Sequence, residues 1–282
     1  MEERFAPLVM TDKCLFEQKT TIAFNEQLAD DIWLMGLRSR EIAALALPGQ
    51  FVMIRIREGL DPLLRRPFSI CGTKEGLILV LYKIIGAGTH IMASRKRGER
   101  VSLLGPLGKG FDLPGPGYAP MIVGGGIGIA PLCFLAQKVG TMAAPIMLGA
   151  ASANDLIPIE EMDIGLSDIS IATDDGSKGY HGVVTDLLRA RLEGESMANQ
   201  RLVYACGPRP MLRKVAEMTL GGIPCQVSLE AAMACGLGAC QGCVVKAAPG
   251  TGKTWYHVCK EGPVFRVEQI DWSAGWSEGG AY

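Results

Sequence analysis

The chain has 282 residues, of which 48% are hydrophobic and 20% charged, and this composition excludes an intrinsically disordered protein. The length admits two domains or three small ones, and it excludes a complete (β/α)₈ barrel of about 250 residues beside any other domain. Twenty-eight Lys and Arg residues balance 29 Asp and Glu residues, which excludes a whole-molecule field that attracts nucleic acid or anionic lipid. Small molecules or other proteins are therefore the expected partners.

The N-terminus and the cysteine count indicate a cytoplasmic protein. Met1-Glu2-Glu3-Arg4 lacks the basic and then apolar grading of a secretion signal, and the nine cysteines are an odd number. Residues 113–137 carry no charge, yet their glycines and prolines would break a helix that crossed a membrane. We expect reduced thiols and no membrane span.

Three segments with different sequence patterns follow one another along the chain and predict a multidomain α+β protein. Residues 1–113 contain short β-rich runs, such as 51–56 and 77–82, with one short helix after Thr89, and this pattern is typical of an antiparallel β-barrel. Residues 114–222 alternate buried strands with amphipathic stretches, as in a Rossmann-like parallel sheet. Residues 223–282 form a small cysteine-rich domain whose tail, 271–282, we expect to fray. In the middle domain the expected strands are 119–123, 145–150, 169–172 and 202–205, and the expected helices are 131–139, 183–192 and 210–219.

The first chemical motif lies in the expected barrel, at Arg65-Arg66-Pro67-Phe68-Ser69-Ile70. Arg66 can bind a pyrophosphate through two hydrogen bonds, and Ser69 can reach a ring nitrogen. Gly88-Thr89 opens a short helix whose free amides favour an anion. Taken alone, an R-P-x-S sequence is more typical of a surface turn than of a cofactor site.

This order of motifs resembles the ferredoxin–NADP reductase superfamily, in which an R-x-x-S strand and a later Gly-Thr helix start hold FAD on a β-barrel. The resemblance implies that Arg66 holds the FAD phosphates and that Ser69 lies near flavin N5 as a catalytic residue. It also implies that the strand with Leu81, Tyr82 and Lys83 lines the nucleotide. The FAD contacts expected in this way are Arg66, Pro67, Phe68, Ser69, Leu81, Tyr82, Lys83, Gly88 and Thr89.

Two further motifs sit where strands of the α/β domain are expected to end. Gly124-Gly125-Gly126-Ile127-Gly128 follows an apolar run, and Cys206-Gly207-Pro208 follows the strand 202–205. Glycines at a strand-to-helix turn let a pyrophosphate approach the backbone, although a tight turn without a ligand is an alternative. The same superfamily carries G-G-x-G-x-x-P and C-G-P motifs at these places. The resemblance implies that Gly124, Gly125, Gly126 and Gly128 face the NAD phosphates, and that Cys206, with Gly207 and Pro208, positions the nicotinamide for hydride exchange as a catalytic residue.

Asp174 and Asp175 follow the expected strand 169–172. Two carboxylates there would repel the 2′-phosphate of NADP, whereas an acidic residue can bind a free ribose hydroxyl. We therefore expect NAD as the nucleotide, with an ordinary acidic turn as the alternative interpretation of this pair.

Four cysteines near the C-terminus have the spacing of a metal centre. Cys235, Cys240 and Cys243 form C-x4-C-x2-C, and Cys259 follows sixteen positions after Cys243. This is the plant-type [2Fe–2S] spacing, whereas structural zinc sites mostly use two short cysteine pairs. By themselves the cysteines leave open a [2Fe–2S] cluster, a four-cysteine zinc site and unliganded thiols.

The combined motifs predict a converter between paired and single electrons. Nicotinamide exchanges a hydride, an iron–sulfur cluster carries single electrons, and FAD can do both. The three histidines, His90, His181 and His257, show no spacing for acid–base catalysis on an organic substrate. Electrons are therefore expected to enter or leave through another protein.

The stretches 228–230 and 233–246 closely resemble the electron-transfer subunit of class 1B dihydroorotate dehydrogenase. In that family an FMN-containing catalytic subunit oxidises dihydroorotate, and electrons pass through [2Fe–2S] and FAD to NAD⁺ in pyrimidine biosynthesis. The resemblance implies an assembly with two copies of each chain, and it implies cluster ligands Cys235, Cys240, Cys243 and Cys259. The expected domains are then 1–113 for FAD, 114–222 for NAD and 223–282 for the cluster.

Two other functions remain open from the sequence. One is an NADH-dependent iron–sulfur flavoprotein reductase that serves an oxygenase, a hydrogenase or a sulfur reductase. The other is a zinc-stapled scaffold without enzymatic activity, which requires all three motifs to be false matches.

Overall fold

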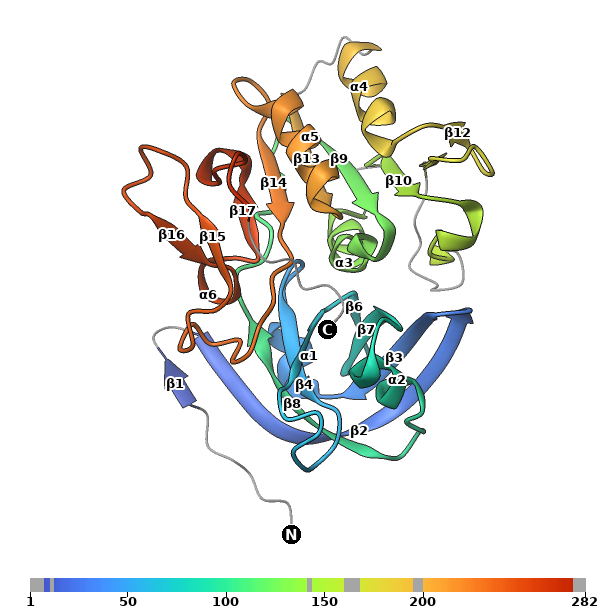
Figure 1. The fold of residues 1–282 in the computed structure, drawn as a ribbon, viewed down its shortest axis with the longest axis vertical. Helices are drawn as coiled ribbons and strands as arrows, with labels where there is room; N and C mark the ends of the chain where they lie inside the picture. The colour runs from blue at the N-terminus through green and yellow to red at the C-terminus, as the bar shows by residue number, and fades with distance from the viewer. Residues whose placement is uncertain (1–7, 11–12, 141–143, 160–167, 195–199, 276–282) are drawn as a thin grey trace.

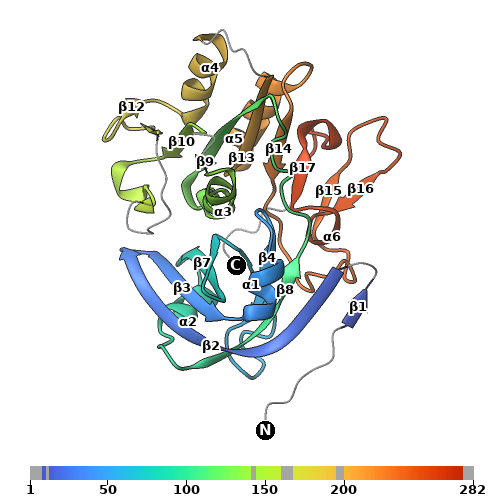
Figure 2. The same cartoon turned by 180° about the vertical axis from the view of Figure 1, so that it is seen from behind.

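A computed structural model describes residues 8–10, 13–140, 144–159, 168–194 and 200–275. It contains a curled antiparallel sheet, a mostly parallel α/β sheet above it, and a small lobe beside both (Figures 1 and 2). These three parts have the architecture expected from the sequence. None of the described helices is both long enough and apolar enough to cross a membrane.

The antiparallel sheet is formed by the N-terminal part of the chain. Its strands pair in the order β5-β4-β8-β2-β3-β7-β6, and β1 pairs with β2. The long strand β2 curves beneath the sheet, which gives the barrel its curl (Figure 1). The elements are β1 (Leu8–Met10), β2 (Lys13–Ala29), β3 (Ile32–Arg38), α1 (Arg40–Leu45), β4 (Phe51–Arg55), β5 (Arg66–Ser69), β6 (Gly72–Lys74), β7 (Leu77–Lys83), α2 (Ala87–Ala93) and β8 (Arg100–Leu107).

Strand β7 explains how the barrel is joined to the next domain. Its side chains alternate between two faces, as they do in any strand. Ile78, Val80 and Tyr82 pack into the barrel core. Leu79 and Leu81 pack instead into a core shared with the α/β domain. Both faces of β7 are therefore buried, which accounts for the uninterrupted apolar run in this strand.

The α/β domain follows the strand and helix pattern expected from the sequence. Its sheet has the order β12-β11-β10-β9-β13-β14-β17, and every pairing is parallel except that of β17 with β14. Helix α3 contacts the barrel strands β6 and β7 as well as the sheet, whereas α4 and α5 contact each other. The elements are β9 (Tyr118–Gly125), α3 (Ile129–Val139), β10 (Ile146–Ala150), β11 (Ile169–Thr173), β12 (Tyr180–His181), α4 (Val184–Gly194), β13 (Gln200–Cys206), α5 (Arg209–Thr219) and β14 (Cys225–Ser228).

The strand order changes direction between β9 and β13. From β9 the chain adds β10 and β11 on one side, and it then adds β13 and β14 on the other. Ligands of open parallel sheets bind at the carboxyl ends of the strands where this reversal occurs. The two glycine-containing motifs, 124–128 and 206–208, both lie at that point.

The C-terminal lobe is tied to the α/β sheet by strand pairing. Strand β17 (Val264–Arg266) pairs with β14, so two strands of the α/β sheet lie within residues 223–282, the range expected for the cluster domain. The rest of the lobe is the hairpin of β15 (Val244–Lys246) and β16 (Trp255–His257), followed by the short helix α6 (Val258–Glu261).

The expectation of a frayed tail is wrong for residues 271–275. Trp272 is only 9% exposed, and its indole Nε1–H donates to the Val267 carbonyl at 2.8 Å. Asp271 pairs with Lys246 at 3.3 Å, and the Arg209 guanidinium donates to the Ala274 carbonyl at 2.6 Å. A buried aromatic ring with a satisfied N–H anchors this stretch. Residues 276–282 lie outside the described part of the chain.

We predict that Gly128→Ala destabilises the protein. Gly128 has an ordinary helical backbone, with φ −60° and ψ −11°, so the backbone itself tolerates alanine. A Cβ atom there would lie 2.6 Å from the backbone of Cys206 and Gly207, and it would push the ends of β9 and β13 apart. Overpacking of this kind costs about 1–3 kcal/mol, measurable as a lower free energy of unfolding in urea. Gly115→Ala is the control, because a Cβ at residue 115 has no atom within 4 Å. Equal stabilities for the two variants would contradict the prediction.

Candidate functional site

The four cysteines of the expected metal centre gather in the C-terminal lobe as two pairs. The thiol of Cys240 interacts with that of Cys235, and the thiol of Cys259 interacts with that of Cys243. Cys243 and Cys259 are buried, whereas Cys240 is exposed. The pairs therefore present one buried edge and one edge that reaches solvent.

Backbone amides of the glycine-rich loop point at the sulfur atoms. The amides of Leu237 and Cys240 donate to Cys235 Sγ at 3.3 and 3.4 Å. The amide of Gly238 donates to Cys259 Sγ at 3.1 Å, from a residue with φ +79° that glycine adopts easily. The amide of Cys259 donates to Cys243 Sγ at 3.4 Å. Such amide hydrogen bonds stabilise thiolates and tune a metal centre.

The same contacts shift the acidity of the thiols. Burial raises the pKa of Cys235, but the amides of Cys240 and Leu237 outweigh it and lower the pKa to about 7. The thiol of Cys259 is the main cause that lowers the pKa of Cys243 to about 6. The pKa of Cys259 rises, because its thiol faces the Cys243 thiolate and is buried. The lowered pKa values of Cys235 and Cys243 favour the thiolate, which is the form that binds metal.

The donor set fits a binuclear cluster. The pairs Cys235/Cys240 and Cys243/Cys259 offer two sulfurs to each of two irons, which is the ligand set of a [2Fe–2S] cluster. A single zinc ion would require all four sulfurs around one point.

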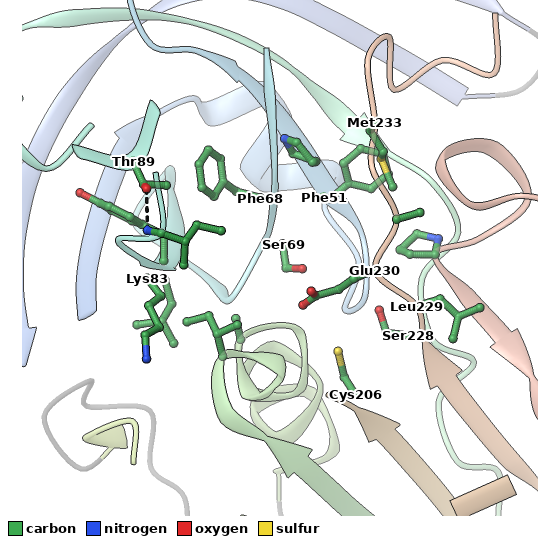
Figure 3. A pocket seen from close by; sticks show the side chains of 18 residues that line it. Phe51, Phe68, Ser69, Lys83, Thr89, Cys206, Ser228, Leu229, Glu230 and Met233 are labelled. Carbon is green, nitrogen blue, oxygen red and sulfur yellow. Dashed lines mark hydrogen bonds between the residues drawn. The ribbon is translucent and has the colours of Figure 1, made fainter. Parts of the chain in front are cut away.

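A cavity of about 200 Å³ lies where the three parts of the molecule meet (Figure 3). Barrel strands, the start of α3, the end of β13 and the segment after β14 all contribute to its walls. Eight of the residues singled out from the sequence line it: Pro67, Phe68, Ser69, Leu81, Tyr82, Lys83, Thr89 and Cys206.

Two expected FAD ligands, Arg66 and Gly88, lie beside this cavity rather than in its lining. They adjoin each other, because a Cβ on Gly88 would be 3.3 Å from Arg66 Nε. Arg66 Nη1 donates to the Leu64 carbonyl at 2.8 Å. The Thr89 hydroxyl accepts from the amides of Ile85 and Gly86 at 2.9 and 3.2 Å, so it caps α2. The assignment of these residues to FAD stays a prediction.

The two expected catalytic residues share this cavity with a carboxylate that the sequence analysis did not assign to the site. Figure 3 shows Glu230 with its carboxylate directed toward Ser69, and Cys206 close to Ser228. Burial, followed by the charge of Glu230, raises the pKa of the Cys206 thiol, which therefore stays neutral at physiological pH. A neutral thiol can position a ring but is a poor nucleophile. Glu230 follows β14 as Cys206 ends β13, and only the parallel pairing of these strands brings the two residues together.

A second cavity, of about 650 Å³, opens at the switch point of the α/β sheet. Gly125, Gly126, Asp174 and Pro208 line it, together with Lys83 from the barrel. Lys83 and Ile127 line both cavities, so the two adjoin. The remaining expected NAD residues, Gly124, Gly128, Asp175, Cys206 and Gly207, do not line this second cavity.

The two aspartates after β11 have different surroundings. Asp174 lines the second cavity. The carboxylate of Asp175 instead accepts hydrogen bonds from the Ser177 hydroxyl and amide at 2.6 and 2.9 Å, and these bonds lower its pKa. One aspartate therefore faces the expected nucleotide, and the other stabilises its own turn.

Comparisons with known proteins agree with this arrangement. Residues 230–271 match the iron–sulfur cluster binding domain of dihydroorotate dehydrogenase B. The dihydroorotate dehydrogenase B (NAD(+)) electron transfer subunit of Desulforamulus reducens is 37% identical over 263 residues, which cover 92% of this chain and 98% of that protein. The corresponding subunit of Bacillus caldolyticus is 38% identical over 260 residues, with coverages of 90% and 98%. The chain belongs to this family of electron transfer subunits.

Solved structures place the family within a wider fold. The structure described as the NADH-dependent reduced ferredoxin-NADP oxidoreductase of flavin-based electron bifurcation has a TM-score of 0.77 and 30% identity, and the match covers 90% of both chains. The ferredoxin reductase of carbazole 1,9a-dioxygenase has a TM-score of 0.61 over 76% of this chain and 68% of that one. At 23% identity, the second match shows the fold alone. Family membership confirms the expected electron-transfer function and the oxidoreductase class.

We predict that Asp174→Asn weakens the preference for NADH over NADPH, whereas Asp175→Asn leaves it nearly unchanged. Loss of a hydrogen bond to a charged group costs about 1.5–3 kcal/mol, so the ratio of kcat/KM values should fall roughly tenfold or more for the first variant. Steady-state reduction of an artificial dye with each nucleotide measures the ratio. Equal effects of the two substitutions would show that Asp174 does not bind the ribose hydroxyl that distinguishes NADH from NADPH.

We predict that Cys240→Ser lowers the iron content while FAD stays bound, because the exposed member of the first cysteine pair is lost and Cys240 does not line the cavity proposed for the flavin. Iron and flavin are quantified on the same purified sample. Ala239→Ser is the matched control, since it adds a hydroxyl to an exposed neighbour in the same loop without removing a sulfur. Full iron content in the Cys240 variant would remove this residue from the ligand set.

Proposed function

We propose that this chain carries electrons between a dihydroorotate-oxidising partner subunit and NAD⁺, as a step of pyrimidine biosynthesis. Its membership of the electron transfer subunit family supports this role. The expected cofactor set of FAD, a [2Fe–2S] cluster and NAD is confirmed by the cluster-domain match and the reductase fold.

The arrangement of the two cavities is the observation that carries the proposal. The smaller cavity adjoins the larger one at Lys83 and Ile127. Its opposite wall contains Glu230, Ala231 and Met233, which lead directly into the first cysteine ligand. A flavin in the smaller cavity would therefore have the nicotinamide on one side and the cluster on the other.

The chain's own residues have distinct tasks in this scheme. FAD supplies the ability to accept single electrons and to give up a hydride. Ser69 on β5 and Cys206 at the end of β13 both line the cavity and would position the reacting rings, Cys206 as a neutral thiol. Phe68 and Tyr82 form an edge-to-face pair, with ring centroids 6.0 Å apart, that makes one apolar side. Tyr82 is held in place by its hydroxyl, which donates to Asn25 Oδ1 at 2.9 Å.

The partner is proposed to be an FMN-containing dihydroorotate dehydrogenase subunit, in an assembly with two copies of each chain. The relatives' name as an electron transfer subunit supports the existence of a catalytic subunit. The exposed Cys240 places one edge of the cysteine centre at the surface, where a second protein can exchange electrons with it. The cytoplasm is the location we propose, and the odd number of cysteines supports it.

An NADH-dependent iron–sulfur flavoprotein reductase with a different partner is the second candidate. The 30% identity and TM-score of 0.77 to the NADH-dependent reduced ferredoxin-NADP oxidoreductase favour it specifically. The two candidates share every residue of the site and differ only in the protein that exchanges electrons with the cluster.

We predict that the isolated protein, prepared without air, shows flavin and iron–sulfur absorbance that NADH bleaches. With the FMN-containing subunit added, dihydroorotate should drive NAD⁺ reduction, followed as NADH absorbance. Bleaching by NADH without any dihydroorotate-driven turnover would favour the second candidate. Colourless protein without iron or flavin would refute both.

A further inference from the structure

A short stretch of chain joins the flavin cavity to the cysteine centre. Glu230, Ala231 and Met233 line the cavity, and Cys235 follows only two residues after Met233. Ala231 is buried and small, and Glu230 is directed toward Ser69. Met233 is therefore the large apolar side chain on the cavity wall nearest in sequence to the first cysteine.

This stretch rests on barrel strand β4. Phe51 lines the same cavity as Met233, at the end where Figure 3 shows both residues. Met53, two residues along β4, shares the face of Phe51, since side chains alternate along a strand. Gly236 lies directly on Met53, because a Cβ there would be 2.7 Å from Met53 Cγ. The stretch from Met233 to Gly236 thus packs along one face of β4.

The barrel and the cysteine centre belong to one apolar core. Phe51, Met53 and Leu107 of the barrel are clustered with Cys243 and Cys259, and Met233 packs against this cluster. A second contact closes the other side, where the Lys109 amide donates to the Gly262 carbonyl at 2.6 Å. Both flanks of the cysteine centre are consequently held on the barrel.

We propose that Met233 is a positioning residue for electron transfer between the flavin and the cluster. Its side chain fills the space between the cavity and the Cys235 loop, so it keeps that loop on β4 and excludes water from the gap. This inference rests on the proposed function. It adds a residue through which the two cofactor sites are coupled.

The electron balance is simple in the direction of NAD⁺ reduction. Each reduced cluster is oxidised by one electron, which the flavin gains. Two such electrons and one proton reduce FAD, which then returns to the oxidised form by giving one hydride to NAD⁺. Tunnelling of an electron falls steeply with distance and falls faster across a void or water than across packed atoms. A well-packed side chain between the two sites therefore affects the single-electron step and leaves the hydride step unaffected.

Methionine suits this position because an unbranched thioether adapts to irregular gaps in a core. Truncation to alanine would leave a void beside the Cys235 loop, since packed surroundings relax only in part. Leucine has a similar volume and should retain most of the packing.

The test compares Met233→Ala with Met233→Leu in the holoprotein. Stopped-flow absorbance follows flavin reduction by NADH, and freeze-quenched electron paramagnetic resonance follows the appearance of the reduced cluster. For Met233→Ala we expect cluster reduction to slow several-fold while flavin reduction by NADH keeps its wild-type rate. Amide hydrogen exchange over residues 233–238 should become faster, and iron content should stay unchanged. Met233→Leu should restore both properties.

Met218→Ala is the matched control. Met218 is also partly buried against the same core, but it lies on α5 and lines neither cavity. We expect it to leave both electron-transfer rates and the exchange of 233–238 unchanged. Equal slowing of flavin and cluster reduction in Met233→Ala, or slowing of neither, would overturn the inference. So would loss of the cluster in both Met233 variants, because the residue would then serve assembly alone.

Failure of the proposed function would look different. In that case the wild-type protein itself would show no cluster reduction by NADH, or no dihydroorotate-driven turnover with its partner subunit. A wild-type protein that performs both steps, beside a Met233→Ala variant that matches it in every rate, would refute only the role of Met233.

Discussion

The structure depends on the burial of barrel strands against the other two parts of the molecule. Strand β7 packs one face inside the barrel and the other against the α/β domain. Strands β4 and β8 contribute Phe51, Met53 and Leu107 to the core that contains Cys243 and Cys259 of the metal centre. Because apolar burial is the main stabilising force in folding, separating these parts would expose much of the core. The two cavities that we propose for the flavin and the nicotinamide therefore have walls from more than one part.

This shared packing decides which functional groups meet. Ser69 comes from the barrel, Cys206 from the end of β13, and Glu230 from the segment that leaves β14, yet all three line one cavity. No pair of them is close in sequence. Electron transfer requires a short distance between the cofactor sites. The common core holds these sites close together without a flexible linker.

Cysteine has two opposite chemical states in this chain, and its surroundings determine which one occurs. Around Cys235, backbone amides outweigh burial and favour the thiolate. Around Cys206, burial and the nearby Glu230 carboxylate favour the neutral thiol. The thiolate suits metal binding, and the neutral thiol suits contact with a hydride-transferring ring. The local field at each sulfur thus separates the two functions.

The sequence by itself determined the elements, the family and most of the chemical inventory, because these depend on local patterns. Apolar runs predicted β9, β10, β11 and β13, and the C-x4-C-x2-C spacing predicted the metal centre. The tertiary structure alone distinguished Asp174 from Asp175, since one turn directs the first into a cavity and ties the second to Ser177. It also brought Glu230 to Cys206 and anchored residues 271–275 through Trp272. The approach of Glu230 to Cys206 is a contact between residues distant in sequence, and such contacts leave no periodic or local signal. The bonds of Asp175 and Trp272 are short in sequence, but whether a side chain is buried or faces a cavity depends on the packing around it.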